Sequence, residues 1–502
     1  MPSTFVDLSH TLDENVQVYP GDPTFSCCPV LNIKQDGWNV HNISMGTHTG
    51  THVDAPYHFL AKGARIDDLP LSTFVGNVVV VDVTRKNAKE VITWEDISPH
   101  SDVIQRKAAQ KHGVFVFLRT DWSQYWKSDA YLEHPFLARD AAQRLIDLGV
   151  KLIGVDALSP DETRVDGSTP DFGVHAVVLG AGAVLAENLT NLAEIQTGEW
   201  LVSLAPLKLK GCDGSPVRAF ACNATSPIPT DVASALESAL SSNASVLPLQ
   251  LSDAYALALM LAAHELLLDS NLLVPADRSS ETVIAGQAVV VYSRYINPPI
   301  SQIDVHSCPA LPACCATLNC APISPMTSTS SQTIIDLTQP LVPGKVPACA
   351  GHPCYNASLN YSLAKGDFAN VHALTLGTHT GTHIDAPYHF FMDGATVDQL
   401  DLSILSAVPA VVADLRAKTS HERIVWDDLT AAADEIQRSG ARVLLLCTGW
   451  SRDWNTPNYS KHPFLDPDVA RRLLDLDVQV IGLDTMSPDK VTEEEETADV
   501  HL

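Results

Sequence analysis

A long segment of this sequence occurs twice. Residues 48–58, HTGTHVDAPYH, return as residues 379–389 with a single change, Val53 to Ile384. Shorter segments recur around it in the same order: residues 5–9, 39–41, 94–96, 134–137 and 150–161 match residues 334–338, 370–372, 426–428, 462–465 and 478–489. Solenoid repeats are only about 20–45 residues long, and the spacing here is several times greater. The chain therefore carries a tandem duplication of a whole domain.

The duplication predicts three parts of the chain. Residues 1–223 form a complete first copy, residues 224–332 join the copies, and residues 333–502 form a second copy truncated at its C-terminus. The joining part begins with Ala- and Leu-rich segments that favour helices, whereas residues 308–332 are rich in Pro, Ser, Thr and Cys. We interpret it as a helical spacer followed by a linker.

Apolar runs alternate with a helical pattern in the first copy. Residues 78–83, 114–118 and 151–155 have the apolar composition of buried strands, and residues 140–149 have the periodicity of a helix. Alternating residues at 199–210 predict a closing strand. This succession indicates an α/β fold with a mixed, partly parallel sheet.

The composition excludes some classes of partner. Lys and Arg total 32 against 59 Asp and Glu, and the resulting net charge of −27 disfavours binding to nucleic acid or to a membrane. No apolar run reaches the length of a transmembrane helix, and the first residues lack the features of a secretory signal. We therefore expect a cytoplasmic protein whose 11 cysteines are reduced thiols.

The repeated segment has the composition of a metal site. His48, His52 and Asp54 offer two imidazoles and a carboxylate from one short stretch. An isolated pair of histidines is more often structural than ligating, but the density of donors and their recurrence favour a site. We predict that these residues bind a divalent cation, Zn²⁺ first and Mn²⁺ as the alternative, because both metals accept imidazole and carboxylate ligands.

Other residues of the segment constrain its shape and chemistry. Gly50 permits a tight turn and Pro56 stops a helix, which excludes the helical H-E-x-x-H arrangement. His58 is either a fourth ligand or the acid and base of a site that keeps an open position. Catalysis needs the open position, which favours the second role.

His175 and Glu187 are the candidates for the rest of the metal site. Their residue types suit metal binding, but a hydrogen-bonded loop histidine and a solvated charge at a helix end would look the same. The residues alone leave both interpretations open.

The pattern H-x-G-T-H-x-D-x-P-x-H resembles that of the metal-dependent cyclase and kynurenine formamidase (arylformamidase) family, and the resemblance covers most of residues 5–223. It implies a swivelling β/β/α domain, present twice. It also implies a binuclear site in the first copy, with Asp54 bridging two ions. One ion would be held by His48, His52 and Asp54, and the other by Asp54, His175 and Glu187.

The resemblance further implies hydrolysis of the amide or formamide bond of a small aromatic substrate, such as N-formylkynurenine of tryptophan catabolism. A metal-activated water would attack the carbonyl, with His58 as general acid and base. No G-x-S-x-G motif is present to supply a serine nucleophile. Tyr19, Phe25 and Trp122 are candidates to stack on the substrate ring, although each of them also suits core packing.

The second copy departs from the family pattern. It has His379, His383, Asp385 and His501 as possible metal ligands and His389 in the place of His58, but no counterpart of Glu187. We predict that it binds metal weakly and contributes little turnover. The duplication also suggests either a homodimer or an intrachain pseudo-dimer in which the second copy shapes the pocket of the first.

Two other functions remain as alternatives. One is a lactonase, lactam hydrolase or cyclase of secondary metabolism, which would share the metal site and differ in its pocket. The other is a non-catalytic, metal-stabilised binding module, which predicts a closed four-ligand site with His58 on the metal.

Overall fold

The computed structural model describes residues 4–165, 171–223, 334–349, 351–491 and 500, which all fall within one compact unit. No helix within these ranges is both long enough and apolar enough to cross a lipid bilayer. The predictions made for the joining part, residues 224–332, and for His501 lie outside the described residues.

The first copy is built on a nine-stranded mixed sheet with the strand order β1-β13-β11-β5-β7-β9-β10-β4-β12. Strands β5, β7, β9 and β10 at its centre are parallel, and the flanking strands pair antiparallel. The predicted mixed α/β fold is therefore confirmed. The strands are β1 (Phe5–Asp7), β4 (His52–Asp54), β5 (Val75–Asp82), β7 (Val114–Arg119), β9 (Leu152–Val155), β10 (Val184–Glu187), β11 (Leu201–Ser203), β12 (Gly214–Pro216) and β13 (Phe220–Cys222).

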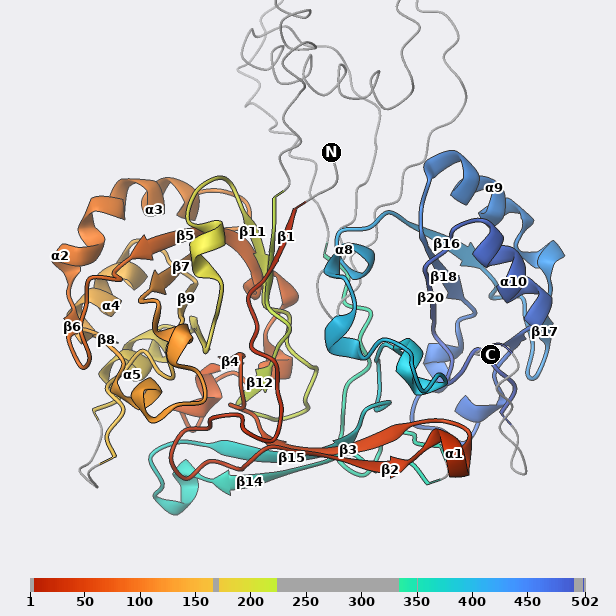
Figure 1. The fold of residues 1–502 in the computed structure, drawn as a ribbon, viewed down its shortest axis with the longest axis horizontal. Helices are drawn as coiled ribbons and strands as arrows, with labels where there is room; N and C mark the ends of the chain where they lie inside the picture. Colours follow the sequence, from red (N-terminus) through yellow and green to blue (C-terminus); the bar gives the residue numbers. More distant parts are fainter. Residues whose placement is uncertain (1–3, 166–170, 224–333, 350, 492–499, 501–502) are drawn as a thin grey trace, which may run out of the picture. The chain divides into compact units, whose positions relative to one another are not determined.

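The central strands are apolar on both faces because each face is covered. Val78 and Val80 of β5 belong to one core cluster, whereas Val79 and Val81 point to the other. The second cluster is completed by buried residues of helices α2 (Trp94–Ile97), α3 (Ser101–Ala108), α4 (Arg139–Asp147) and α5 (Gly173–Gly180), which lie beside β5, β7 and β9 in Figure 1.

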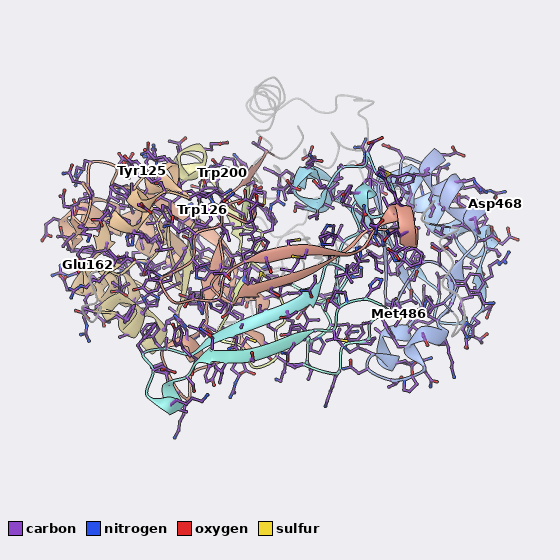
Figure 2. The ribbon with its side chains drawn as sticks, turned by 60° about the horizontal axis from the view of Figure 1, so that its bottom comes forward. Tyr125, Trp126, Glu162, Trp200, Asp468 and Met486 are labelled. Atoms are coloured by element: carbon purple, nitrogen blue, oxygen red, sulfur yellow. The ribbon has the colours of Figure 1, made fainter. Side chains whose placement is uncertain are left out.

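A separate four-stranded antiparallel sheet combines strands from both copies. Its order is β14-β15-β3-β2, so that β3 of the first copy pairs with β15 of the second, with Met45 opposite Leu374. Figure 2 shows the four strands side by side. They are β2 (Ser26–Leu31), β3 (Val40–Gly46), β14 (Asn356–Tyr361) and β15 (Val371–Gly377).

The second copy is the shorter of the two in the described part of the chain. Its own sheet has three parallel strands, β16 (Ala410–Asp414), β18 (Val443–Cys447) and β20 (Val480–Leu483). Helices α9 (Thr430–Ser439) and α10 (Pro467–Asp475) share a hydrophobic core with it.

One predicted element is shorter than expected. The alternating residues 199–210 were expected to form one closing strand, but only Leu201–Ser203 does so, as β11. Pro206 interrupts the pattern, because proline has no backbone N–H to donate to a neighbouring strand. The chain therefore leaves the sheet after Ser203 and returns to it as β12.

Candidate metal centre

Strand β4 carries His52 and Asp54 of the repeated segment and lies between β10 and β12 in the sheet. His52 lies opposite Glu187 of β10, and Asp54 lies opposite Gly214 of β12. Residues directly opposite each other on antiparallel strands point to the same face. The pairing thus puts the Glu187 carboxylate next to the His52 ring although the two are far apart in sequence.

Two glycines make room for the close packing of this part of the sheet. Gly50 has a φ of +64°, and a Cβ there would lie 2.3 Å from Cδ2 of Leu12. A Cβ on Gly214 would lie 2.8 Å from the Val53 carbonyl oxygen and 2.9 Å from Cε1 of His48. After Asp54 the chain turns into a single 3₁₀ turn, Pro56–His58, which returns His58 to the same site.

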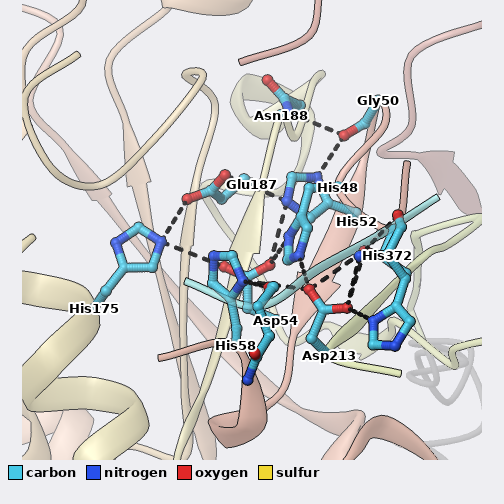
Figure 3. Close-up of polar contacts among 12 residues, drawn as sticks. His48, Gly50, His52, Asp54, His58, His175, Glu187, Asn188, Asp213 and His372 are labelled. Carbon is cyan, nitrogen blue, oxygen red and sulfur yellow. Dashed lines mark hydrogen bonds and ion pairs between the residues drawn. The ribbon is translucent and has the colours of Figure 1, made fainter. Parts of the chain in front are cut away.

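Each of the three predicted ligand histidines has one ring nitrogen held by a protein acceptor. His52 Nδ1 donates to the Gly50 carbonyl at 2.7 Å, His175 Nδ1 is 2.6 Å from Asp161 Oδ2, and His48 Nε2 is 2.5 Å from Asp213 Oδ2. Figure 3 shows these rings turned toward Asp54 and Glu187. Hydrogen bonds of this kind fix the tautomer and orientation of metal-binding imidazoles.

The opposite ring nitrogens converge on the two carboxylates. His52 Nε2 lies 3.3 Å from both Asp54 Oδ1 and Glu187 Oε2, while His175 Nε2 lies 3.5 Å from Asp54 Oδ2 and 3.4 Å from Glu187 Oε1. Nδ1 of His48 is 2.6 Å from Asp54 Oδ1. All these side chains are buried.

Three buried atoms in this cluster lack a hydrogen-bond partner: His52 Nε2, Asp54 Oδ2 and Glu187 Oε1. Buried polar groups are almost always hydrogen-bonded, so unpartnered atoms that face one another need another explanation. Imidazole nitrogens and carboxylate oxygens gathered around a common point fit divalent cations. The residues present therefore fit the predicted metal.

The charges of the cluster support the same conclusion. Burial opposes ionisation of Asp54, but the charge of His48 and the close contacts of His175, His48 and His52 hold the Asp54 pKa well below its ordinary value. Burial lowers the pKa of His52, yet its contacts with Asp54 and Glu187 outweigh burial and raise that pKa to about 9. The carboxylates thus stay ionised, and a divalent cation can displace the imidazole protons.

His58 stands apart from the ligand set by its hydrogen bond. Its Nδ1 donates to the main-chain carbonyl of Asn370 at 2.7 Å, and its ring centroid lies 4.0 Å from that of His48. Burial, followed by the charge of His48, lowers the pKa of His58. The ring is therefore neutral near pH 7, with a nitrogen within 4.8 Å of the ligand atoms of Asp54 and His175.

A sequence model of one family, described as "Putative cyclase", matches residues 6–162 and again residues 335–490. The chain belongs to the cyclase family. Among curated proteins it is similar to the kynurenine formamidase of Bacillus cereus, at 32% identity over 219 residues, 43% of this chain and 96% of that protein. The kynurenine formamidase of Geobacillus thermodenitrificans is also 32% identical, over 220 residues, 44% of this chain and 97% of that protein.

Among solved structures, the chain is similar to isatin hydrolase A from Labrenzia aggregata bound to benzyl benzoate. It is 30% identical, with a TM-score of 0.40, and the match covers 45% of this chain and 95% of that one. Each of these similar proteins is covered almost completely by less than half of the duplicated chain.

Several residues that contact the site were not identified from the sequence: Asp161, Asp213, Asn370 and His372. Asp161 belongs to the Ser-Pro-Asp segment that recurs at residues 487–489, and His372 belongs to the recurring Asn-Val-His. Their recurrence was a usable signal, although it gave no role. Nothing in the sequence marked Asp213, because the second copy has no described counterpart of it.

The aromatic residues at the site are mostly not the expected ones. Phe59 and Phe172 have ring centroids 4.7 and 5.8 Å from that of His175. Tyr19 is near them, 6.4 Å from Phe172. Phe25, in contrast, packs against the core, and the Trp122 indole donates to the Ala130 carbonyl beside Tyr125.

The second copy keeps only part of this arrangement. His379, His383 and Asp385 lie together, with His389 stacked on His379 at a centroid distance of 3.9 Å. The Asp385 side chain is 35% exposed, whereas that of Asp54 is fully buried. Within the described residues of the second copy, no carboxylate occupies the place of Glu187 or Asp213.

Proposed function

We propose that this protein is a metal-dependent hydrolase that cleaves the amide or formamide bond of a small aromatic substrate at the first copy. One observation carries the proposal: His52 Nε2, Asp54 Oδ2 and Glu187 Oε1 are buried without a hydrogen-bond partner, in a cluster where His52 Nε2 lies 3.3 Å from one oxygen of each carboxylate. A purely structural cluster would leave these atoms unsatisfied.

Five side chains would hold the metal. His48, His52 and Asp54 would bind one ion, and Asp54, His175 and Glu187 would bind a second. The donor set suits Zn²⁺ first and Mn²⁺ second. When bound, a pair of divalent cations lowers the pKa of water toward about 7 and polarises a carbonyl oxygen.

His58 would transfer a proton from the attacking water to the departing nitrogen. Because its Nδ1–H donates to the Asn370 carbonyl, Nε2 carries the lone pair and can accept a proton from the attacking water. The same nitrogen then protonates the departing amine nitrogen. General acid and base catalysis of this kind contributes about 10²- to 10⁴-fold to the rate. The neutral state of His58 near pH 7 prepares it for the first of these steps.

The substrate class rests on the aromatic residues and on the relatives. Phe59 and Phe172, with centroids 5.1 Å apart, stand next to His175 and offer ring faces to an aromatic substrate. The similar proteins from Bacillus cereus and Geobacillus thermodenitrificans are kynurenine formamidases. N-formyl derivatives of aromatic amines are therefore the first substrates to test.

The experiment is a hydrolysis assay with the chain loaded with Zn²⁺ or Mn²⁺ against N-formylkynurenine, other aryl formamides, aryl lactones and cyclic amides. We expect the formamides to have the highest kcat/KM. His48→Ala should abolish the activity and His379→Ala should leave most of it. Preferential turnover of lactones or cyclic amides would contradict the substrate class. Activity that survives His48→Ala and disappears with His379→Ala would contradict the choice of copy.

A further inference from the structure

We propose that the second copy acts as an intrachain partner that positions His58 and Asp213 of the first copy through Asn370 and His372. This inference rests on the proposed function in one respect only, the catalytic role of His58. It assigns to the shorter second copy a use that requires no active site of its own.

Asn370 makes three hydrogen bonds with the turn that carries His58. Its carbonyl accepts from His58 Nδ1 at 2.7 Å, its N–H donates to the His58 carbonyl at 2.8 Å, and its side-chain amide donates to the Tyr57 carbonyl at 2.7 Å. The residue stands just before β15, the strand that pairs with β3. The position of the His58 ring is therefore set by the second copy.

His372 reaches the metal centre through Asp213. Its Nδ1 makes a short contact with Asp213 Oδ1, and its backbone N–H donates to the same oxygen at 3.1 Å. The other carboxylate oxygen of Asp213 lies 2.5 Å from His48 Nε2. The contacts thus run from the second copy through Asp213 to a predicted ligand, and Figure 3 shows dashed contacts from Asp213 to both His48 and His372.

Asn39 and His41 of the first copy make the corresponding contacts with the second copy, except for the contact with Asp213. Asn39 repeats the role of Asn370, since its carbonyl accepts from His389 Nδ1 at 2.8 Å and its amide donates to the Tyr388 carbonyl at 2.7 Å. His41 repeats the backbone pairing of His372, with Thr378 in place of Thr47. However, His41 has no described counterpart of Asp213 to hold.

Hydrogen bonds that orient metal-binding imidazoles typically change metal affinity or activity by about 10- to 100-fold when removed. His372 does not contact a predicted metal ligand directly, because Asp213 lies between it and His48. Asp213 is fully buried, and both of its carboxylate oxygens have hydrogen-bond partners. Loss of the His372 contact would leave the buried Asp213 carboxylate without one of its hydrogen-bond donors. We therefore assign His372 and Asn370 as positioning residues.

The experiment compares His372→Ala with His41→Ala, the matched substitution on the other side of the duplication. A chelator competition gives the affinity for Zn²⁺, and steady-state kinetics give kcat and KM separately. We expect His372→Ala to weaken Zn²⁺ binding about 10-fold and to lower kcat with little change in KM. His372→Asn, whose amide can replace the Nδ1 donor, should recover most of both quantities. His41→Ala should match the wild type.

A second pair of variants covers the case in which His372→Ala does not fold. Asn370→Ala removes the side-chain hydrogen bond to the Tyr57 carbonyl and keeps the two main-chain bonds with His58. It should lower kcat while Asn39→Ala does not, with thermal unfolding recorded for both. Equal effects of the two members of either pair on Zn²⁺ affinity and kcat would overturn the inference. If the wild type hydrolyses none of the substrates, the proposed function fails, and the Zn²⁺ affinities of His372→Ala and His41→Ala still decide the inference.

Discussion

Asp161 and His175 are joined at two points. Asp161 Oδ2 accepts from the backbone N–H of His175 at 3.0 Å and contacts its Nδ1 at 2.6 Å, while Oδ1 accepts from the Val174 N–H at 2.8 Å. The carboxylate therefore caps the first turn of α5 and orients the imidazole that this turn carries. Fold and metal centre depend on the same side chain.

Asp161→Asn should weaken metal binding by about 10- to 100-fold, because the amide cannot hold the imidazole as the carboxylate does. The measurement is Zn²⁺ affinity by chelator competition, with thermal unfolding recorded in parallel. Asp489→Asn, the same change in the second copy, is the control and should leave the affinity of the first copy as it was. An unaltered affinity in Asp161→Asn would contradict the role of Asp161.

His58→Gln should lower kcat by about 10²- to 10⁴-fold while the metal content per chain stays the same. This result separates a proton-transfer role from a ligand role, because removing a ligand would release metal. Elemental analysis of the purified variant provides the measurement. Loss of metal together with activity would favour the closed four-ligand site of a binding module.

Gly50→Ala should destabilise the chain by about 2–4 kcal/mol, because it combines a strained backbone with a clash. Gly50 has a φ of +64°, and the added Cβ would meet Leu12 Cδ2 at 2.3 Å. The control is Gly180→Ala in α5, where no heavy atom lies within 4 Å of the new Cβ. Urea unfolding of both variants measures the difference, and equal free energies of unfolding would refute the prediction.

His10 should make the first copy less stable in mild acid. Its ring stacks on Trp126 at a centroid distance of 4.2 Å, and burial, followed by the charge of Lys127, lowers its pKa from 6.5 to about 4. The unfolded chain binds this proton more readily than the folded chain, so stability present above pH 6.5 is lost as the pH falls toward 4. His10→Phe keeps the stacking and removes the titration.

The free energy of unfolding of wild type and His10→Phe, measured between pH 7 and pH 4, tests this linkage. The wild type should lose about 1–3 kcal/mol more than the variant across that interval. Parallel profiles would show that His10 does not titrate between the folded and unfolded states.

The sequence allowed the core of the site to be predicted because its donors are clustered in a repeated segment. His48, His52 and Asp54 lie in one strand and the turn before it, so their proximity follows from local chain geometry. The mixed α/β fold followed from apolar runs that alternate with a helix. His175 and Glu187 needed the family resemblance, because only strand pairing brings Glu187 opposite His52.

The contribution of the second copy could not be predicted from local pattern. Asn370 and His372 reach His58 and Asp213 only because β15 pairs with β3 in a sheet shared by both copies. Sequence spacing does not specify such a pairing between distant strands. The pseudo-dimer hypothesis indicated the second copy as a whole, whereas the residues that make the contact required the structure.

The most direct test of the account is a crystal structure of the Zn²⁺-loaded chain with anomalous diffraction at the zinc edge. We predict two anomalous peaks beside Asp54, one next to His48 and His52 and the other next to His175 and Glu187, and weaker or no density at His379, His383 and Asp385. Density confined to the second copy, or none between Asp54 and Glu187, would contradict the metal centre on which the proposed function depends.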